Sequence, residues 1–187
     1  MRIWLVLAAA CVLAGGCVTV DAPVQQATFE NVRLLQATDI PQIALGAFEL
    51  APGLPPQMDK TISMRAGSLK APGTGSFSSY LRQTFETELT AAGKLSPEGT
   101  AVLSGQLTRS EVKTSPAGEG HLAARFRVTR GGKVMFDKEL AVTESWKFDF
   151  IGAIAIPEAM NRYTALYPKL VTALFNDAEF RQALRAP

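Results

Sequence analysis

Two alternating apolar segments joined by a glycine pair constrain the fold of this chain more than any other feature. Residues 122–128 place apolar side chains at every second position, and residues 134–146 repeat the pattern over a longer stretch that is broken only by Lys138 and Glu144. Alternation with a period of two is typical of strands with one buried face. Gly131 and Gly132 lie between the two segments and suit a tight turn in which both residues adopt positive φ. The sequence therefore predicts an antiparallel hairpin whose apolar face needs a covering layer.

Two helical patterns can supply that layer. Residues 78–92 carry apolar side chains at spacings of three and four, and Gly93 suits the end of a helix. A second such pattern follows Pro157, which we expect to open the helix in its first turn. Pro168 lies inside this pattern and predicts a kink, because proline lacks a backbone N–H and clashes with the preceding turn. A short final helix is expected over residues 178–184.

The remaining segments complete a sheet. Residues 32–35 and 43–50 are short apolar runs that we interpret as strands, and residues 103–107 alternate in the same way. Residues 51–76 are rich in proline and glycine and predict a long irregular loop. The chain is therefore predicted to form one α+β domain over residues 29–187, with a single layer of mainly antiparallel strands, about four to five, packed by two amphipathic helices. Four residues are expected at the centre of its core: Phe85, Leu89, Phe126 and Leu170.

The amino terminus has the three parts of a secretory signal. Arg2 supplies a positive start, residues 3–13 are apolar, and small residues precede Cys17. The apolar run is shorter than the roughly 20 residues that span a bilayer core. We therefore expect residues 1–16 to be a cleaved signal peptide. Residues 17–28 mix polar and small side chains and predict a flexible tether.

The segment Leu13-Ala14-Gly15-Gly16-Cys17 resembles the lipobox of bacterial lipoprotein precursors. The resemblance implies that the Cys17 thiol is diacylated and becomes the first residue of the mature protein. The leucine stands one residue further from the cysteine than usual, and Cys11 is a weaker candidate because a shorter apolar run precedes it. In Gram-negative lipoproteins an aspartate after the cysteine commonly signals retention at the inner membrane, so Val18 implies sorting to the outer membrane, facing the periplasm. Two acyl chains anchor a protein to a bilayer far more firmly than one.

Composition argues against several kinds of site. With Cys11 in the signal peptide and Cys17 acylated, the mature protein has no cysteine left for a disulfide, a metal or a nucleophile. His121 is the only histidine, which excludes a cluster of histidine and cysteine zinc ligands, and we interpret it as a surface residue at the start of a strand. The formal charge is +2, with Lys and Arg scattered along the chain, which argues against nucleic-acid binding. We therefore expect no catalytic residue, no cofactor and no metal.

Residues 148–156 form the candidate interaction surface. They contain one charge, Asp149, and fit neither the helical nor the strand period. One interpretation is a connection buried beneath the last helix. The other is a patch that docks on a partner or touches lipid, because contiguous exposed apolar surface usually marks an interaction site. The candidate residues are Phe148, Phe150, Ile151 and Ile154.

The order of the expected elements resembles that of a group of small envelope lipoproteins. The resemblance covers roughly residues 40–175 and is clearest over residues 80–89, Tyr-Leu-Arg-Gln-Thr-Phe-Glu-Thr-Glu-Leu. The group includes the auxiliary lipoproteins of ABC-type lipid transporters (the PqiC type), the YajG-like lipoproteins and periplasmic domains of the CsgG and TolB type. It implies a non-catalytic accessory or adaptor of an envelope transport or assembly system, with another envelope protein as partner. Two alternatives stay open: a carrier that holds a lipid or other apolar ligand between sheet and helices, and an enzyme.

Overall fold

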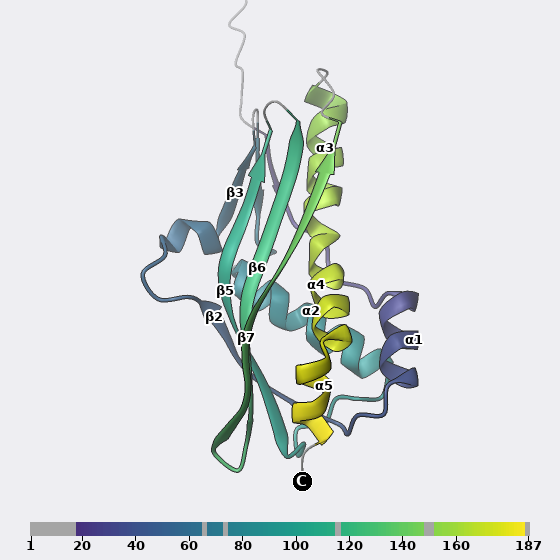
Figure 1. The fold of residues 1–187 in the computed structure, drawn as a ribbon. Helices are drawn as coiled ribbons and strands as arrows, with labels where there is room; N and C mark the ends of the chain where they lie inside the picture. Colours follow the sequence, from purple (N-terminus) through teal and green to yellow (C-terminus); the bar gives the residue numbers. More distant parts are fainter. Residues whose placement is uncertain (1–17, 65–66, 73–74, 115–116, 148–151, 186–187) are drawn as a thin grey trace, which may run out of the picture.

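The computed structural model describes residues 18–64, 67–72, 75–114, 117–147 and 152–185, which form two sheets and a set of helices (Figure 1). The smaller sheet has the strand order β1-β4-β3, with β1 Val18–Asp21, β3 Thr61–Met64 and β4 Gly67–Lys70. The larger sheet has the order β2-β5-β6-β7, with β2 Ala44–Leu50, β5 Ala101–Lys113, β6 Gly118–Arg130 and β7 Lys133–Trp146. The helices are α1 Phe29–Ala37, the 3-10 helix η1 Pro56–Asp59, α2 Phe77–Ala91, α3 Gly152–Thr164, α4 Leu166–Asn176 and α5 Ala178–Arg185. The predicted α+β class is confirmed.

The predicted hairpin forms half of the larger sheet. β6 and β7 pair antiparallel from Arg130 opposite Lys133 to Gly118 opposite Trp146. The two residues of the turn, Gly131-Gly132, have φ angles of 53° and 78°, the positive values for which glycine is favoured. β5 pairs antiparallel with β6, while β2 joins β5 in parallel. The sheet is therefore mainly antiparallel, as predicted.

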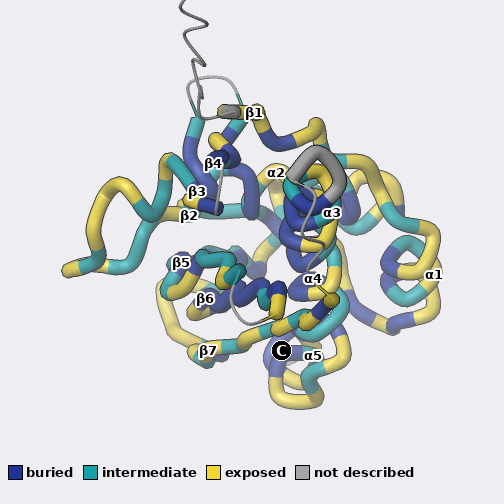
Figure 2. Tube along the Cα trace, turned by 90° about the horizontal axis from the view of Figure 1, so that it is seen from above, coloured by how far each residue is buried: buried dark blue, intermediate teal, exposed yellow. Residues whose placement is uncertain are grey.

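The helices α2 to α5 lie along one face of this sheet, α1 lies against α2 and α4, and buried residues gather between sheet and helices (Figure 2). Phe85 of α2 lies in the centre of the core. Its ring centroid is 5.4 Å from that of Phe126 in β6 and 6.3 Å from that of Phe175 in α4. The predicted central residues Phe85, Leu89, Phe126 and Leu170 are all fully buried, which confirms that prediction. The opposite face of the sheet carries charged side chains.

The carboxyl-terminal helical pattern starts earlier than predicted and breaks near Pro168. Pro157 lies inside α3 instead of in its first turn, so the predicted helix start was wrong. The physical reason is that α3 packs against β6, and this packing keeps the turn before the proline helical although one backbone donor is lost. Near Pro168 the pattern divides, because α3 ends at Thr164 and α4 begins at Leu166. The interruption at Ala165 lies three residues before Pro168, which belongs to α4, and the kink expected at Pro168 itself stays a prediction.

Residues 32–35, which we predicted to be a strand, lie within α1, so this prediction was wrong. Thr28 caps the helix, because its Oγ1 accepts a hydrogen bond from the backbone N–H of Asn31 at 3.3 Å. A four-residue apolar run fits a turn of helix as well as a strand. Leu35 is fully buried against the rest of the core, so tertiary packing decides between the two.

The three-stranded sheet comes from segments in which no strand was predicted. β1 lies within the segment expected to be a tether, and β3 and β4 lie within the expected loop 51–76. Each of these strands has four residues, and β1 runs parallel to β4. Strands this short are marginal alone and depend on pairing and packing for their stability. The strands thus form two sheets where a single layer was expected.

Candidate functional site

Most of the predicted functional residues lie outside the described part of the chain. The structure does describe the residues next to them in the sequence. The candidates outside the described ranges are Cys17, Phe148, Phe150 and Ile151. Ile154 lies in α3, but its side chain is not described. β1 begins at Val18, directly after Cys17, and α3 begins at Gly152, directly after residue 151. Within the described ranges, no helix is long and apolar enough to cross a membrane.

Both boundaries lie at the same end of the molecule (Figure 1). Val18 pairs with Gly67 at the start of β4. At the same end, β5 finishes at Lys113, and Gly118 of β6 pairs with Trp146 of β7. We call this region, defined by Val18, Gly67, Lys113, Gly118 and Trp146, the Val18 end. The β6–β7 turn and the carboxyl terminus lie at the opposite end (Figure 1).

The segment that follows β1 is hydrogen-bonded to the domain. The backbone N–H of Ala22 donates to the carbonyl of Lys70 at 2.8 Å, which extends the β1–β4 pairing by one residue. The hydroxyl of Tyr80, in α2, donates to the carbonyl of Pro23 at 2.8 Å. Ala22 itself is buried, with 4% of its surface exposed. The chain is therefore fixed to the sheet and to α2 before α1 begins.

Glu88 of α2 holds the start of α1. Its carboxylate is fully buried and accepts hydrogen bonds from the Thr28 N–H at 3.0 Å, the Thr28 hydroxyl at 2.9 Å and Asn31 Nδ2 at 3.0 Å. A carboxylate at a helix amino terminus also interacts favourably with the helix dipole. Asn31 reaches α4 as well, because its Nδ2 donates to the Pro168 carbonyl at 3.0 Å and its Oδ1 accepts from the Thr172 hydroxyl at 2.6 Å. This buried network joins α1 to both α2 and α4.

A second buried network joins β5 to α3 and α4. Ser110 Oγ lies 2.6 Å from Tyr163 Oη, which lies 2.9 Å from Tyr167 Oη. Burial raises the pKa of Tyr163 and of Tyr167 well above the usual value for a phenol. Burial also raises the pKa of Tyr80 to about 12. These phenols therefore remain protonated at neutral pH and act as hydrogen-bonding groups between elements.

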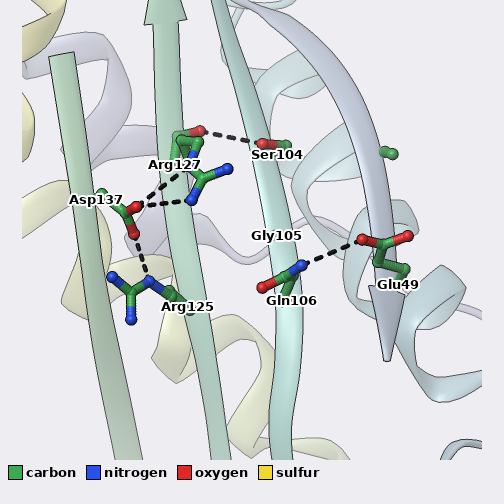
Figure 3. Close-up of a pocket in the computed structure, with 8 residues that line it drawn as sticks. Glu49, Ser104, Gly105, Gln106, Arg125, Arg127 and Asp137 are labelled. Atoms are coloured by element: carbon green, nitrogen blue, oxygen red, sulfur yellow. Dashed lines mark hydrogen bonds and ion pairs between the residues drawn. The ribbon is translucent and has the colours of Figure 1, made fainter. Parts of the chain in front are cut away.

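The open face of the larger sheet has a shallow polar hollow of about 130 Å³ (Figure 3). Asp137 of β7 accepts hydrogen bonds from Arg125 at 2.5 Å and from Arg127 at 2.8 Å, and these bonds hold the pKa of its carboxyl below the usual range. Gln106 Nε2 donates to Glu49 Oε1 at 3.2 Å. The hollow is smaller than the roughly 300–1,000 Å³ of a typical small-molecule site, and the groups named here bond to one another. We interpret it as a network of surface ion pairs.

His121, which we predicted to be a surface residue, is buried, with 8% of its surface exposed, so that prediction was wrong. Its Nδ1 lies 3.2 Å from Thr143 Oγ1, and its Nε2 lies 3.0 Å from Glu119 Oε2. A hydroxyl, an imidazole and a carboxylate are also the groups of a hydrolase triad. Such a triad needs free donors for an oxyanion. Here β6 is paired on both sides, so its backbone N–H groups belong to the sheet ladder. Thr143 and Glu119 thus bind a buried histidine.

Aromatic rings occupy the space between sheet and helices in which a carrier would hold its ligand. The ring centroids of Tyr80 and Tyr167 are 4.7 Å apart, and those of Phe77 and Tyr163 are 5.8 Å apart. The described core is therefore packed by its own side chains.

Among the residues that the structure describes, no group of three or more His, Cys, Asp or Glu side chains could hold a metal ion.

No known family model matches the chain, and no curated protein matches its sequence. The fold is similar to that of the protein XCC0632 from Xanthomonas campestris, which is assigned to the family DUF330. The TM-score is 0.56 at 9% sequence identity, over 88% of this chain and 96% of the other. A minor lipoprotein from Acinetobacter baumannii matches with a TM-score of 0.46 at 13% identity, over 78% of this chain and 96% of that one. The similarity to XCC0632 shows a shared fold and nothing about ligands or partners.

Proposed function

We propose that the protein is a lipid-anchored accessory lipoprotein of the outer membrane, facing the periplasm, that acts by binding another envelope protein and not by catalysis. The observation that carries this proposal is the position of β1. Val18, the first residue that the structure describes, is already paired with Gly67 in β1, so the chain belongs to the sheet one residue after the lipobox cysteine. The sequence of residues 13–17 supports acylation, and Val18 supports sorting to the outer membrane.

The polar groups of the domain support a binding role over a catalytic one. The arginines of the hollow are paired with Asp137, and the buried phenols have raised pKa values. His121 is held between Thr143 and Glu119 on a paired strand. The arginines and the phenols bond to other groups of the fold, and His121 contacts Thr143 through Nδ1. The packed core likewise favours the accessory role over the carrier. The order of the elements supports a place beside the auxiliary lipoproteins of ABC-type lipid transporters.

The lipid anchor is tested by mass spectrometry of protein extracted from membranes. We expect a diacylated cysteine at position 17 as the first residue of the mature chain. The Cys17→Ser variant should remain uncleaved or leave the acylated fraction, whereas Cys11→Ser should mature normally. A mature wild-type protein recovered in the aqueous fraction with a free thiol at Cys17 would overturn the proposal.

The partner is tested by photo-crosslinking in intact cells. Photoreactive residues would replace exposed apolar side chains, for example Phe29 in α1 and Val134 in β7, which are 78% and 55% exposed. We expect at least one position around the domain to give a discrete adduct with another envelope protein, identified by mass spectrometry. A domain that crosslinks to nothing but lipid at every exposed position would contradict an accessory role.

A further inference from the structure

We infer that the Val18 end of the domain rests directly on the bilayer surface, with the lipid headgroups as its partner, and that the strands of the larger sheet point away from the membrane. This inference rests on the proposed acylation of Cys17. Its first support is the absence of slack between the anchor and the sheet. Val18 is paired with Gly67 in the first position of β1. Adjacent Cα atoms are about 3.8 Å apart in any chain, so a single peptide unit joins the acylation site to the first paired residue of the sheet.

The second support is the way in which the following segment is fixed. β1 pairs with β4 over its four residues, and the Thr19 and Ser68 hydroxyls lie 3.1 Å apart across that pairing. The Ala22 N–H and the Pro23 carbonyl continue the attachment. Glu88 then holds the start of α1. A flexible tether would let the domain rotate freely above the membrane, whereas this segment transmits the position of the anchor to the domain.

The third support is the geometry of the elements that share the Val18 end. Lys113 is exposed at the tip of β5, and Lys147 is exposed directly after β7. Lysine side chains at this position suit contact with anionic headgroups. α3 also begins at this end, so its axis runs from the bilayer into the domain (Figure 1). β6 has 13 residues. At a rise of about 3.3 Å per residue, the β6–β7 turn lies roughly 40 Å from the Val18 end.

The experiment uses full-length acylated protein reconstituted into vesicles of phosphatidylcholine and anionic phosphatidylglycerol that contain a small fraction of lipid with a nickel-chelate headgroup. A nitroxide label is attached to Lys113→Cys at the Val18 end or, as the matched control, to Lys133→Cys beside the β6–β7 turn. Both lysines are exposed, and acylation of Cys17 leaves no other cysteine in the mature chain. We expect the lipid-bound nickel to enhance relaxation of the label at position 113 several-fold more than at position 133.

A linker variant tests the cause of that difference. A Gly/Ser segment of about 15 residues inserted between Cys17 and Val18 has a root-mean-square length of roughly 20 Å and should abolish most of the difference between the labels. Equal relaxation at both positions in the vesicle-bound protein would overturn the inference. If the labels at positions 113 and 133 still differ in relaxation after the insertion, the short connection between Cys17 and β1 is not what orients the domain. Mass spectrometry of the same samples separates these results from a failure of acylation, which would remove the basis of the proposed function as well.

Discussion

At the scale of single residues, Glu88 and Asn31 hold the amino-terminal helix in place. Glu88 is a fully buried carboxylate, and its hydrogen-bond donors come from Thr28 and Asn31. A buried charge is tolerated only where hydrogen bonds compensate for its lost hydration. The network therefore makes the folding of α1 depend on α2 and α4.

Replacing Asn31 by alanine should lower the free energy of unfolding by about 2–4 kcal/mol, because the change leaves the buried carboxylate of Glu88 and the partly buried hydroxyl of Thr172 with fewer partners. Urea unfolding followed by circular dichroism measures the effect. Gln36→Ala, at an exposed position of the same helix, is the control and should change stability little. Equal costs for the two substitutions would show that the network contributes nothing beyond the helix itself.

The buried tyrosines predict a loss of stability at alkaline pH. An unfolded phenol loses its proton near pH 10.0, whereas the pKa of Tyr80 is raised to about 12 in the folded protein and those of Tyr163 and Tyr167 are also raised. Folding therefore favours the protonated phenols. Their stabilising contribution is complete below pH 10.0 and decreases as the pH rises toward the folded pKa values. Urea unfolding over this pH range should show the decrease, and Tyr163→Phe should have a shallower pH dependence than the wild type. A slope unchanged by Tyr163→Phe would contradict this account.

At the scale of elements, β6 separates the core from the open face of the sheet. Phe126 is fully buried against Phe85, while the side chain of the next residue, Arg127, is 50% exposed and paired with Asp137. Phe126→Ala should cost about 3–5 kcal/mol through lost burial and a cavity. Arg127→Ala should cost at most about 1 kcal/mol, the usual range of an exposed ion pair. Thermal unfolding of both variants checks the prediction, and comparable losses would mean that the strand faces are assigned wrongly.

The β6–β7 pairing also depends on a glycine at the Val18 end. A Cβ atom on Gly118 would lie 2.2 Å from Nε1 of Trp146, on the opposite strand, so a side chain there must displace the indole. Gly118→Val should therefore shift the tryptophan fluorescence toward that of an exposed indole. Trp146 is the only tryptophan after the signal peptide, so the signal has a single source. Ser145→Val, at an exposed neighbouring position, is the control, and identical spectra for the two variants would contradict the predicted clash.

At the scale of the whole molecule, the segment 148–156 is described only in part. Residues 148–151 lie outside the described ranges and stay a prediction, whereas residues 152–156 belong to α3, where Ile156 is partly buried against the core. From the sequence we expect partial burial, with Phe148 and Ile156 inward and Phe150 and Ile151 at the rim. Replacing Phe150 and Ile151 together by serine should then preserve the melting temperature and abolish association with the partner. A melting curve measured beside a crosslinking assay decides the matter. Unfolding of the double variant would instead place the segment in the core, and no change in either measurement would defeat both interpretations.

The sequence alone determined the elements whose local signals agree with their final environment. The glycine pair and two alternating segments specified the β6–β7 hairpin, and the three-and-four spacing around Phe85 and Leu89 specified α2 and its buried face. Pro168 indicated an interruption near the division between α3 and α4, whereas Pro157, which lacks the same backbone donor, lies inside α3. The lipobox is recognised from the order of residues 13–17, so its identification needed no information about the fold.

Only the tertiary structure decided the identity of α1, the three-stranded sheet and the environment of His121. Residues 32–35 fit either kind of element until α2 and α4 supply the network around Glu88. β1, β3 and β4 have four residues each, too few for a local pattern. Val18 of β1 pairs with Gly67 of β4, although 67 − 18 = 49 positions separate them in the sequence. Such contacts between distant segments leave no local trace in the sequence. They also replace the expected tether with a segment fixed to the fold, and so determine which end of the molecule lies next to Cys17.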